Sequence, residues 1–298
     1  MVWAHLLLNL LALSYAAAAV DSTSPSADSH GFGPRDFPAA AVITGEDWHG
    51  VTSSEIHSWD FFSLPNRGDP RPFFRVTPDP LWGQVVQVDQ TPTNRTVFGG
   101  RIFSDTRAKG APYVARQWIY SAVWKFSPNW GVAGHWKAMF GNWAEPNSGN
   151  MRVEMCFPQP GVRTTLCHSG TPANWRNERT LRIDPVRIYS IADGDYYQTV
   201  MFVKLLSTSD VRIGWAFRKL TSGAGRTLQT GRWVGIMDTH DPGTWTDDDG
   251  IRSIHLGNTL NDVPRAAQSV YYGPWVVLDL SNPEAPRDPW GIFSFFGI

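Results

Sequence analysis

Glycine and proline divide this chain into short segments, and their spacing limits what it can fold into. The 298 residues include 27 Gly and 22 Pro, about 16% of the chain against roughly 12% in an average protein. Breaks at this density leave little room for long helices. The intervals between them are rich in β-branched and aromatic residues, with polar and apolar positions alternating, as is typical of strands. We therefore expect an all-β protein.

Many intervals match a strand pattern, and they follow one another from residue 73 to residue 280. Only short pieces, such as Asp47–Ser58, favour a helix. So many short strands indicate a sandwich or β-jelly roll, with two stacked antiparallel sheets and one concave face. We find no linker or repeat after residue 36 and expect a single domain over residues 37–298. The expected strands are Phe73–Thr77, Gln84–Asp89, Thr96–Phe103, Tyr113–Phe126, Trp136–Trp143, Asn150–Phe157, Val162–His168, Leu181–Tyr189, Tyr196–Leu206, Val211–Lys219, Arg232–Met237, Ile251–Leu256 and Ser269–Leu280.

The first residues predict a targeting segment. The apolar run Leu6–Leu13 is too short to span a bilayer, and Ala17-Ala18-Ala19 fits a cleavage site. We expect a signal peptide over residues 1–19, a loose polar segment over residues 20–36, and an extracellular, secreted protein. The lack of Lys or Arg before the apolar run leaves a buried N-terminal helix as the alternative.

Charge and composition exclude some functions. The chain has 26 Lys+Arg and 27 Asp+Glu, which argues against a nucleic-acid partner. Hydrophobic residues make up 42% of the chain, too many for a disordered polymer. No later stretch reaches the roughly 18 apolar residues that a membrane helix needs.

Three further features are expected in a secreted chain. Cys156 and Cys167 flank a turn, and a hairpin centred near Gly161–Val162 would place them opposite each other as a disulfide. Asn94 begins a glycosylation sequon. The run Asp247, Asp248 and Asp249 is read as a solvated turn, with a calcium site as the alternative.

Alternation along the strands assigns side chains to faces. Arg152, Glu154 and Cys156 share one face of their strand, and His135 and Lys137 share one face of another. Gln198 points away from the apolar side of its strand. Tyr271 and Trp275 share a face of the last strand, and Trp143 ends an earlier one. We expect these polar and aromatic groups to line the concave face.

Aromatic rings can pack against the apolar face of a sugar while neighbouring charged groups hydrogen-bond its hydroxyls, and basic groups can bind the carboxylate of an acidic sugar. The alternative is that the Trp residues are core and Arg152 pairs with Glu154 on the surface. Glycoside hydrolysis requires two carboxyl groups, but Glu154 is isolated in its strand. Lyase chemistry instead requires cations that neutralise a uronate, a base and an acid, with no metal.

Several short stretches point to a family. The run YSAVWKFSPNW (residues 120–130) followed by GHWKAMFG (residues 134–141) resembles the concanavalin A-like jelly rolls of secreted polysaccharide lyases, in particular those acting on alginate and glucuronan. Lys137 matches the Lys of the family's second strand, and residues 150–155 loosely match the third. Residues 250–257 and 269–277 resemble the closing strands. The family's Tyr-x-Tyr pair is absent, since the matching strand reads VRTTLCH (residues 162–168).

The sequence thus predicts a polysaccharide lyase that cleaves a uronate-containing polymer by β-elimination. Lys137 and Arg152 would neutralise the uronate, His135 would be the base and Tyr271 the acid. Substrate-binding residues would be Glu154, Gln198, Trp143 and Trp275. Two alternatives remain open: a non-catalytic, lectin-like binder on the same fold, and a purely structural secreted protein.

Overall fold

The computed structural model describes residues 31–58, 69, 71–91, 96–102, 117–128, 136–143, 152–159, 163–169, 179–182, 193–207, 210–223, 225, 227–241, 253–260 and 266–293. For the six-stranded sheet described below, the structure describes the backbone of the strands and the register in which they pair. The predicted signal peptide, residues 1–19, lies outside the described residues. No described helix is long and apolar enough to cross a membrane.

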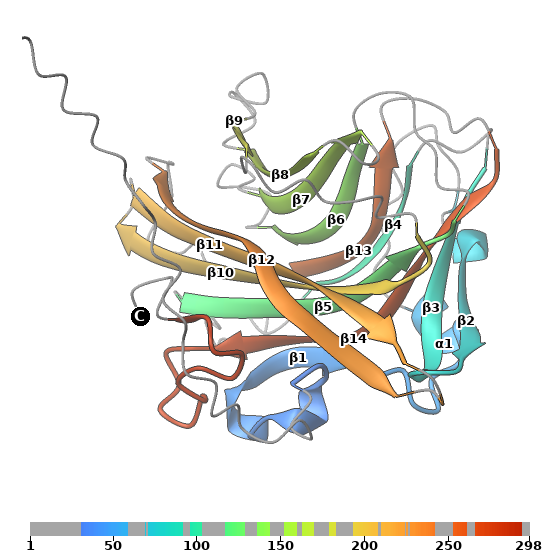
Figure 1. Ribbon diagram of the computed structural model, residues 1–298, viewed down its shortest axis with the longest axis horizontal. Helices are drawn as coiled ribbons and strands as arrows, with labels where there is room; N and C mark the ends of the chain where they lie inside the picture. The colour runs from blue at the N-terminus through green and yellow to red at the C-terminus, as the bar shows by residue number, and fades with distance from the viewer. Residues whose placement is uncertain are drawn as a thin grey trace, which may run out of the picture. The chain divides into compact units, whose positions relative to one another are not determined.

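The described strands form two antiparallel sheets (Figure 1). The eight-stranded sheet runs in the order β12-β11-β10-β5-β14-β3-β2, with β1 paired to β14. Its strands are β1 (Val42–Glu46), β2 (Phe74–Asp79), β3 (Gly83–Gln90), β5 (Gln117–Phe126), β10 (Tyr196–Ser207), β11 (Asp210–Ser222), β12 (Leu228–Asp241) and β14 (Gln268–Asp279).

The six-stranded sheet runs in the order β4-β13-β6-β7-β8-β9. Its strands are β4 (Thr96–Ile102), β6 (Trp136–Trp143), β7 (Arg152–Gln159), β8 (Arg163–Ser169), β9 (Arg179–Arg182) and β13 (Ser253–Leu260). The expectation of an all-β jelly roll is confirmed, and β6 has the bounds that the alternation predicts.

The expected helical piece is present as one short helix. Helix α1 (Ser53–His57) begins after Thr52, whose hydroxyl accepts a hydrogen bond from the backbone N–H of Glu55 at 3.3 Å. The Glu55 carboxylate accepts one in return from the backbone N–H of Thr52 at 2.6 Å. This reciprocal pair satisfies donors at the start of the helix that have no partner within it. The described part of the chain also contains three 3₁₀ turns of three residues each: η1 (Pro34–Asp36), η2 (Ala39–Ala41) and η3 (Arg71–Phe73).

Both faces of the central strands in the eight-stranded sheet are buried. On one face, Ile119, Phe202 and Leu278 pack with Ile292 and Phe293 near the C-terminal end. On the other face of β5, three large rings are at most 2% exposed: Trp118, Tyr120 and Trp124. Eight successive residues from Tyr196 on β10 are buried. In a sheet with one face in solvent, polar and apolar residues alternate along each strand; these strands do not show that alternation.

The loose N-terminal segment ends earlier than predicted. Phe32 is 2% exposed and belongs to the core. The carbonyl oxygen of Gly31 accepts a hydrogen bond from Nε1 of Trp290 at 2.8 Å. The Asp36 carboxylate accepts from the backbone N–H groups of Phe32 and Gly33 at 2.9 and 3.1 Å. The predicted loose boundary at residue 36 is therefore wrong, because Gly31 already packs against the sheet.

Candidate functional site

Four of the predicted site residues lie on two neighbouring strands of the six-stranded sheet. In the register of β6 and β7, Lys137 is opposite Cys156 and Trp143 is opposite Arg152. Glu154 pairs with Cys167 on β8. The position opposite Lys137 is four residues from Arg152 along β7, a spacing of about 13 Å at the rise of a strand. Lys137 and Arg152 thus share a strand pair but sit at opposite ends of it.

Several predicted positions lie outside the described residues. In the sequence, His135 comes directly before β6, and Asn94 comes two residues before β4. The run Asp247, Asp248 and Asp249 follows β12. Among the residues described, no cluster of three or more His, Cys, Asp or Glu is arranged to hold a metal ion.

The two cysteines are not opposite each other. Cys156 pairs with Thr165, and Cys167 pairs with Glu154, because the register shifts between Cys156 and Gln159. The two cysteines are therefore diagonal neighbours, whose Cα atoms are typically about 7–8 Å apart. Disulfides usually join Cα atoms about 4.4–6.8 Å apart. The expectation that the hairpin aligns them directly is wrong.

Gln198 and Trp275 lie in the interior of the eight-stranded sheet. Both are 0% exposed. The amide nitrogen of Gln198 donates to the Ser121 hydroxyl at 2.7 Å. The Trp275 ring meets Tyr120 edge-on, with centroids 6.3 Å apart. Groove lining was wrong for both positions. Gln198 lies on the face that the N-terminal segment covers, where its amide nitrogen also donates to the carbonyl of Gly31 at 3.4 Å. Trp275 lies on the opposite face of the sheet, the face that carries Tyr120.

Tyr271 lies on β14, in the sheet that does not contain Lys137 and Arg152. It is half-buried and pairs with Lys125 of β5 and Gln87 of β3. The Lys125 ammonium lies 5.0 Å from the centre of the Tyr271 ring. Neither Lys137 nor Arg152 is a strand neighbour of Tyr271.

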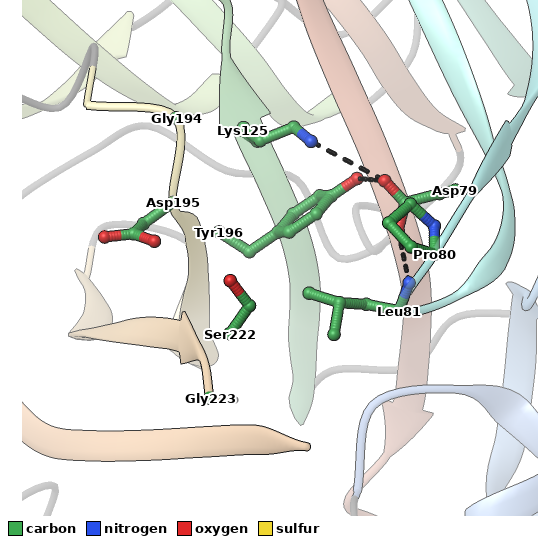
Figure 2. A pocket seen from close by; sticks show the side chains of 9 residues that line it. All are labelled: Asp79, Pro80, Leu81, Lys125, Gly194, Asp195, Tyr196, Ser222 and Gly223. Atoms are coloured by element: carbon green, nitrogen blue, oxygen red, sulfur yellow. Dashed lines mark hydrogen bonds and ion pairs between the residues drawn. The ribbon is translucent and has the colours of Figure 1, made fainter. Parts of the chain in front are cut away.

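Beside Tyr271 the eight-stranded sheet holds a small polar pocket that the sequence did not indicate (Figure 2). Its volume is about 260 Å³. It lies where the β2–β3 turn approaches the start of β10 and the end of β11. Its lining residues are Asp79, Pro80, Leu81, Lys125, Gly194, Asp195, Tyr196, Ser222 and Gly223.

The turn between β2 and β3 fixes one wall of this pocket. One Asp79 carboxylate oxygen accepts hydrogen bonds from the backbone N–H groups of Leu81 and Trp82 at 2.9 and 3.2 Å. Gly83 completes the turn with φ +74°, a conformation that glycine adopts without strain. This aspartate turn orients the second carboxylate oxygen toward Tyr196 and Lys125, as Figure 2 shows.

A carboxylate, a phenol and an ammonium meet in the pocket. The Tyr196 hydroxyl donates to Asp79 at 2.5 Å, and the Lys125 ammonium lies 3.5 Å from the same oxygen. Burial, followed by the negative charge of Asp79, raises the pKa of Tyr196 far above its usual range. The phenol therefore remains a proton donor, and the Asp79 carboxylate is occupied by its partners. The pocket can hydrogen-bond a small polar molecule through these groups.

No sequence motif predicts this pocket, because its lining residues come from four separate parts of the chain. The local signal that could have found one wall is Asp79 followed by Pro80 at a strand end, a typical turn start. The approach of Tyr196 and Lys125 depends on the pairing of β10 with β5.

Comparison with known proteins bears on the fold. No family model matches the chain, and no curated protein matches it in sequence. Solved structures do match, and they show the fold: a jelly roll similar to that of several polysaccharide lyases.

Three of these structures are similar over most of their length. The marine PL-14 alginate lyase from Aplysia kurodai has a TM-score of 0.52 and 10% identity, covering 71% of this chain and 88% of its own. The endo-β-1,4-glucuronan lyase from the fungus Trichoderma reesei has a TM-score of 0.51 and 12% identity, covering 78% and 95%. A mutant of alginate lyase Aly36B in complex with alginate trisaccharide has a TM-score of 0.51 and 12% identity, covering 81% and 99%. The resemblance that the sequence motifs indicated is thus confirmed for the fold.

Proposed function

We propose that this protein is a secreted polysaccharide lyase that cleaves a uronate-containing polymer on its six-stranded sheet. One observation supports the proposal: Lys137 and Trp143 lie on β6, and Arg152 and Glu154 lie on β7, the strand paired with it. The similarity in fold to alginate and glucuronan lyases supports the same assignment.

The distance along β7 between Arg152 and the position opposite Lys137 suggests different roles for Lys137 and Arg152. Lys137 is two residues from His135 in the sequence, whereas its register position is about 13 Å from Arg152. We assign bond cleavage to the His135–Lys137 end of the strand pair. Arg152, with Trp143 opposite it and Glu154 beside it, would hold a neighbouring uronate unit of the same chain.

The reaction at that end is a β-elimination. His135 removes the proton from the carbon next to the uronate carboxylate, while the Lys137 ammonium stabilises the negative charge that develops on the carboxylate. The electron pair of the broken C–H bond forms a carbon–carbon double bond as the bond to the 4-linked oxygen breaks. The leaving oxygen takes a proton from solvent or from the imidazolium formed in the first step. Tyr271 has no part in this scheme, since it lies in the other sheet beside Lys125.

An ultraviolet assay tests the proposal, because the unsaturated product absorbs and the substrate does not. With alginate or glucuronan, Lys137→Ala should lower kcat about 10²–10³-fold, the effect of losing one stabilising group in the transition state. Arg152→Ala should mainly raise KM, because it would remove binding that substrate and transition state share. Arg75→Ala is the control, since it breaks only an exposed ion pair with Asp89 at 3.0 Å. A chelator should leave the rate unchanged, and a rate that depends on calcium would point to the aspartates at 247–249.

A non-catalytic carbohydrate binder on the same fold is the second candidate. It is favoured by the lack of the family's tyrosine pair in the matching strand, residues 162–168. In that case no acidic polysaccharide would yield an absorbing product. Migration in a polysaccharide-containing gel would nevertheless be retarded, and Arg152→Ala would abolish the retardation.

A further inference from the structure

Among the residues that the structure describes, the guanidinium of Arg218 is a half-buried cation with no acidic partner. It lies on β11, in the eight-stranded sheet. Within the described part of the chain it makes no ion pair. By contrast, Lys125 and Lys219 on the same sheet have carboxylate oxygens at 3.5 and 2.6 Å. Buried charges in proteins are normally paired, so Arg218 is an exception.

Its surroundings hold Arg218 in one orientation. Its Nε donates to Oε1 of Gln198 at 2.7 Å, and Gln198 is itself fixed by the Ser121 hydroxyl at 2.7 Å. The guanidinium carbon lies 4.4 Å from the centre of the Trp233 ring and 5.7 Å from that of Phe32. Trp233 is anchored in turn by its indole N–H, which donates to the carbonyl of Trp290 at 3.0 Å.

This arrangement leaves the terminal edge of the guanidinium unoccupied by the described residues. Arginine has five N–H donors, of which only the one on Nε is used by Gln198. The two terminal nitrogens form a planar fork that matches the two oxygens of a carboxylate. The flanking rings stabilise the cation in part. Burial still disfavours the charge, since it lowers the pKa of Arg218 to about 10.

We propose that Arg218 is the centre of a carboxylate-binding site, in which the two terminal nitrogens hold one carboxylate end-on beside Trp233. A carboxylate fits better than a phosphate because Arg218 brings a single positive charge, and its contacts in the described part of the chain include no second cation. The ligand is therefore a small organic acid or a sugar acid. This site lies in the eight-stranded sheet and does not depend on the proposed lyase activity.

Nuclear magnetic resonance of the intact protein tests the site directly. Sodium glucuronate, titrated against sodium chloride at constant ionic strength, should shift the Nε–Hε resonance of Arg218 saturably. Glucose, the neutral sugar, should not. Acetate separates the sources: binding equal to that of glucuronate indicates any small carboxylate, and weaker binding indicates a sugar acid. Inorganic phosphate should bind less tightly than either.

Variants provide the matching controls. Arg218→Gln should lose the increase in Tm that glucuronate causes in the wild type. Arg218→Lys keeps the charge but not the fork, and should bind glucuronate about tenfold more weakly, the loss expected for one hydrogen bond. Arg232→Gln, at an exposed position on the adjacent β12, should respond like the wild type.

Two results would overturn the proposal. The first is a chloride titration that shifts the Arg218 resonance as much as glucuronate does. The second is a glucuronate response that persists in Arg218→Gln, since the ligand would then bind elsewhere. If Arg218→Gln does not fold, the Arg218→Lys affinity and the wild-type resonance decide the question.

Discussion

At the scale of single residues, the polar pocket shows how a buried carboxylate is kept in place. Asp79 is 7% exposed. Its partners are two backbone N–H groups, the Tyr196 hydroxyl and the Lys125 ammonium. Each partner that is lost would leave a buried polar oxygen without a hydrogen bond, which costs stability.

Tyr196→Phe tests that statement. It removes one hydrogen bond to a buried carboxylate, so the free energy of unfolding should fall by about 1–3 kcal/mol. Urea unfolding, followed by tryptophan fluorescence, measures the change. Tyr271→Phe is the matched control, because the structure describes no hydrogen bond from the Tyr271 hydroxyl, and it should change stability by less than about 0.5 kcal/mol. Equal losses in both variants would show that the Asp79 bond adds nothing.

Residue identity predicted some of the site and not the rest. The types at Lys137, Arg152 and Glu154 suggested sugar chemistry, and the register places them on paired strands. Gln198 and Trp275 have the same polar or aromatic character, yet both are buried. A local pattern does not reveal which segment will cover a face, so it could not separate these two sets.

At the scale of elements, β1 is the strand that the sequence did not predict. Its five residues lie against β14, with Gly45 opposite Val276 and Glu46 opposite Trp275. A Cβ atom at Gly45 would lie 2.7 Å from the carbonyl oxygen of Trp275. β1 can therefore approach β14 this closely only because residue 45 has no side chain.

Gly45→Ala should push β1 away from β14. We expect a loss of about 1–3 kcal/mol, the usual cost of overpacking, together with faster proteolysis within residues 42–46. Thermal unfolding and limited proteolysis measure the two effects. Gly33→Ala is the control, since a Cβ there would meet its nearest atom at 3.4 Å, an ordinary contact. A Gly45→Ala variant as stable and as resistant as Gly33→Ala would contradict the interpretation.

At the scale of the whole molecule, the strand order brings distant segments together. β5 lies between β10 and β14, so residues near 120, 200 and 275 are neighbours. This sheet collects tyrosines whose hydroxyls are withdrawn from water. Burial is the main cause that raises the pKa of Tyr120, Tyr196 and Tyr197.

These raised pKa values predict instability in alkali. A tyrosine whose folded pKa exceeds its unfolded value stabilises the fold fully below about pH 10, and this contribution is lost as the pH rises further. We expect these three tyrosines to ionise only as the protein unfolds. Phenolate absorbance and near-ultraviolet circular dichroism, recorded together against pH, measure this. Ionisation of all eight tyrosines while the dichroism stays native would refute the prediction.

The sequence by itself determined that this chain is built from strands, and it placed most of them within a few residues. Turn residues and two-residue alternation act locally, so they can be interpreted without knowing the fold. It also indicated the lyase-like jelly roll through short motifs around Lys137. Only the tertiary structure decided which faces are covered and which strands meet. Segments at residues 31–37 and 290–293 pack on the eight-stranded sheet, and the pairing of β10 with β5 and β11 assembles the Asp79 pocket and the Arg218 site. Such contacts join residues far apart in the chain, and no local pattern specifies them.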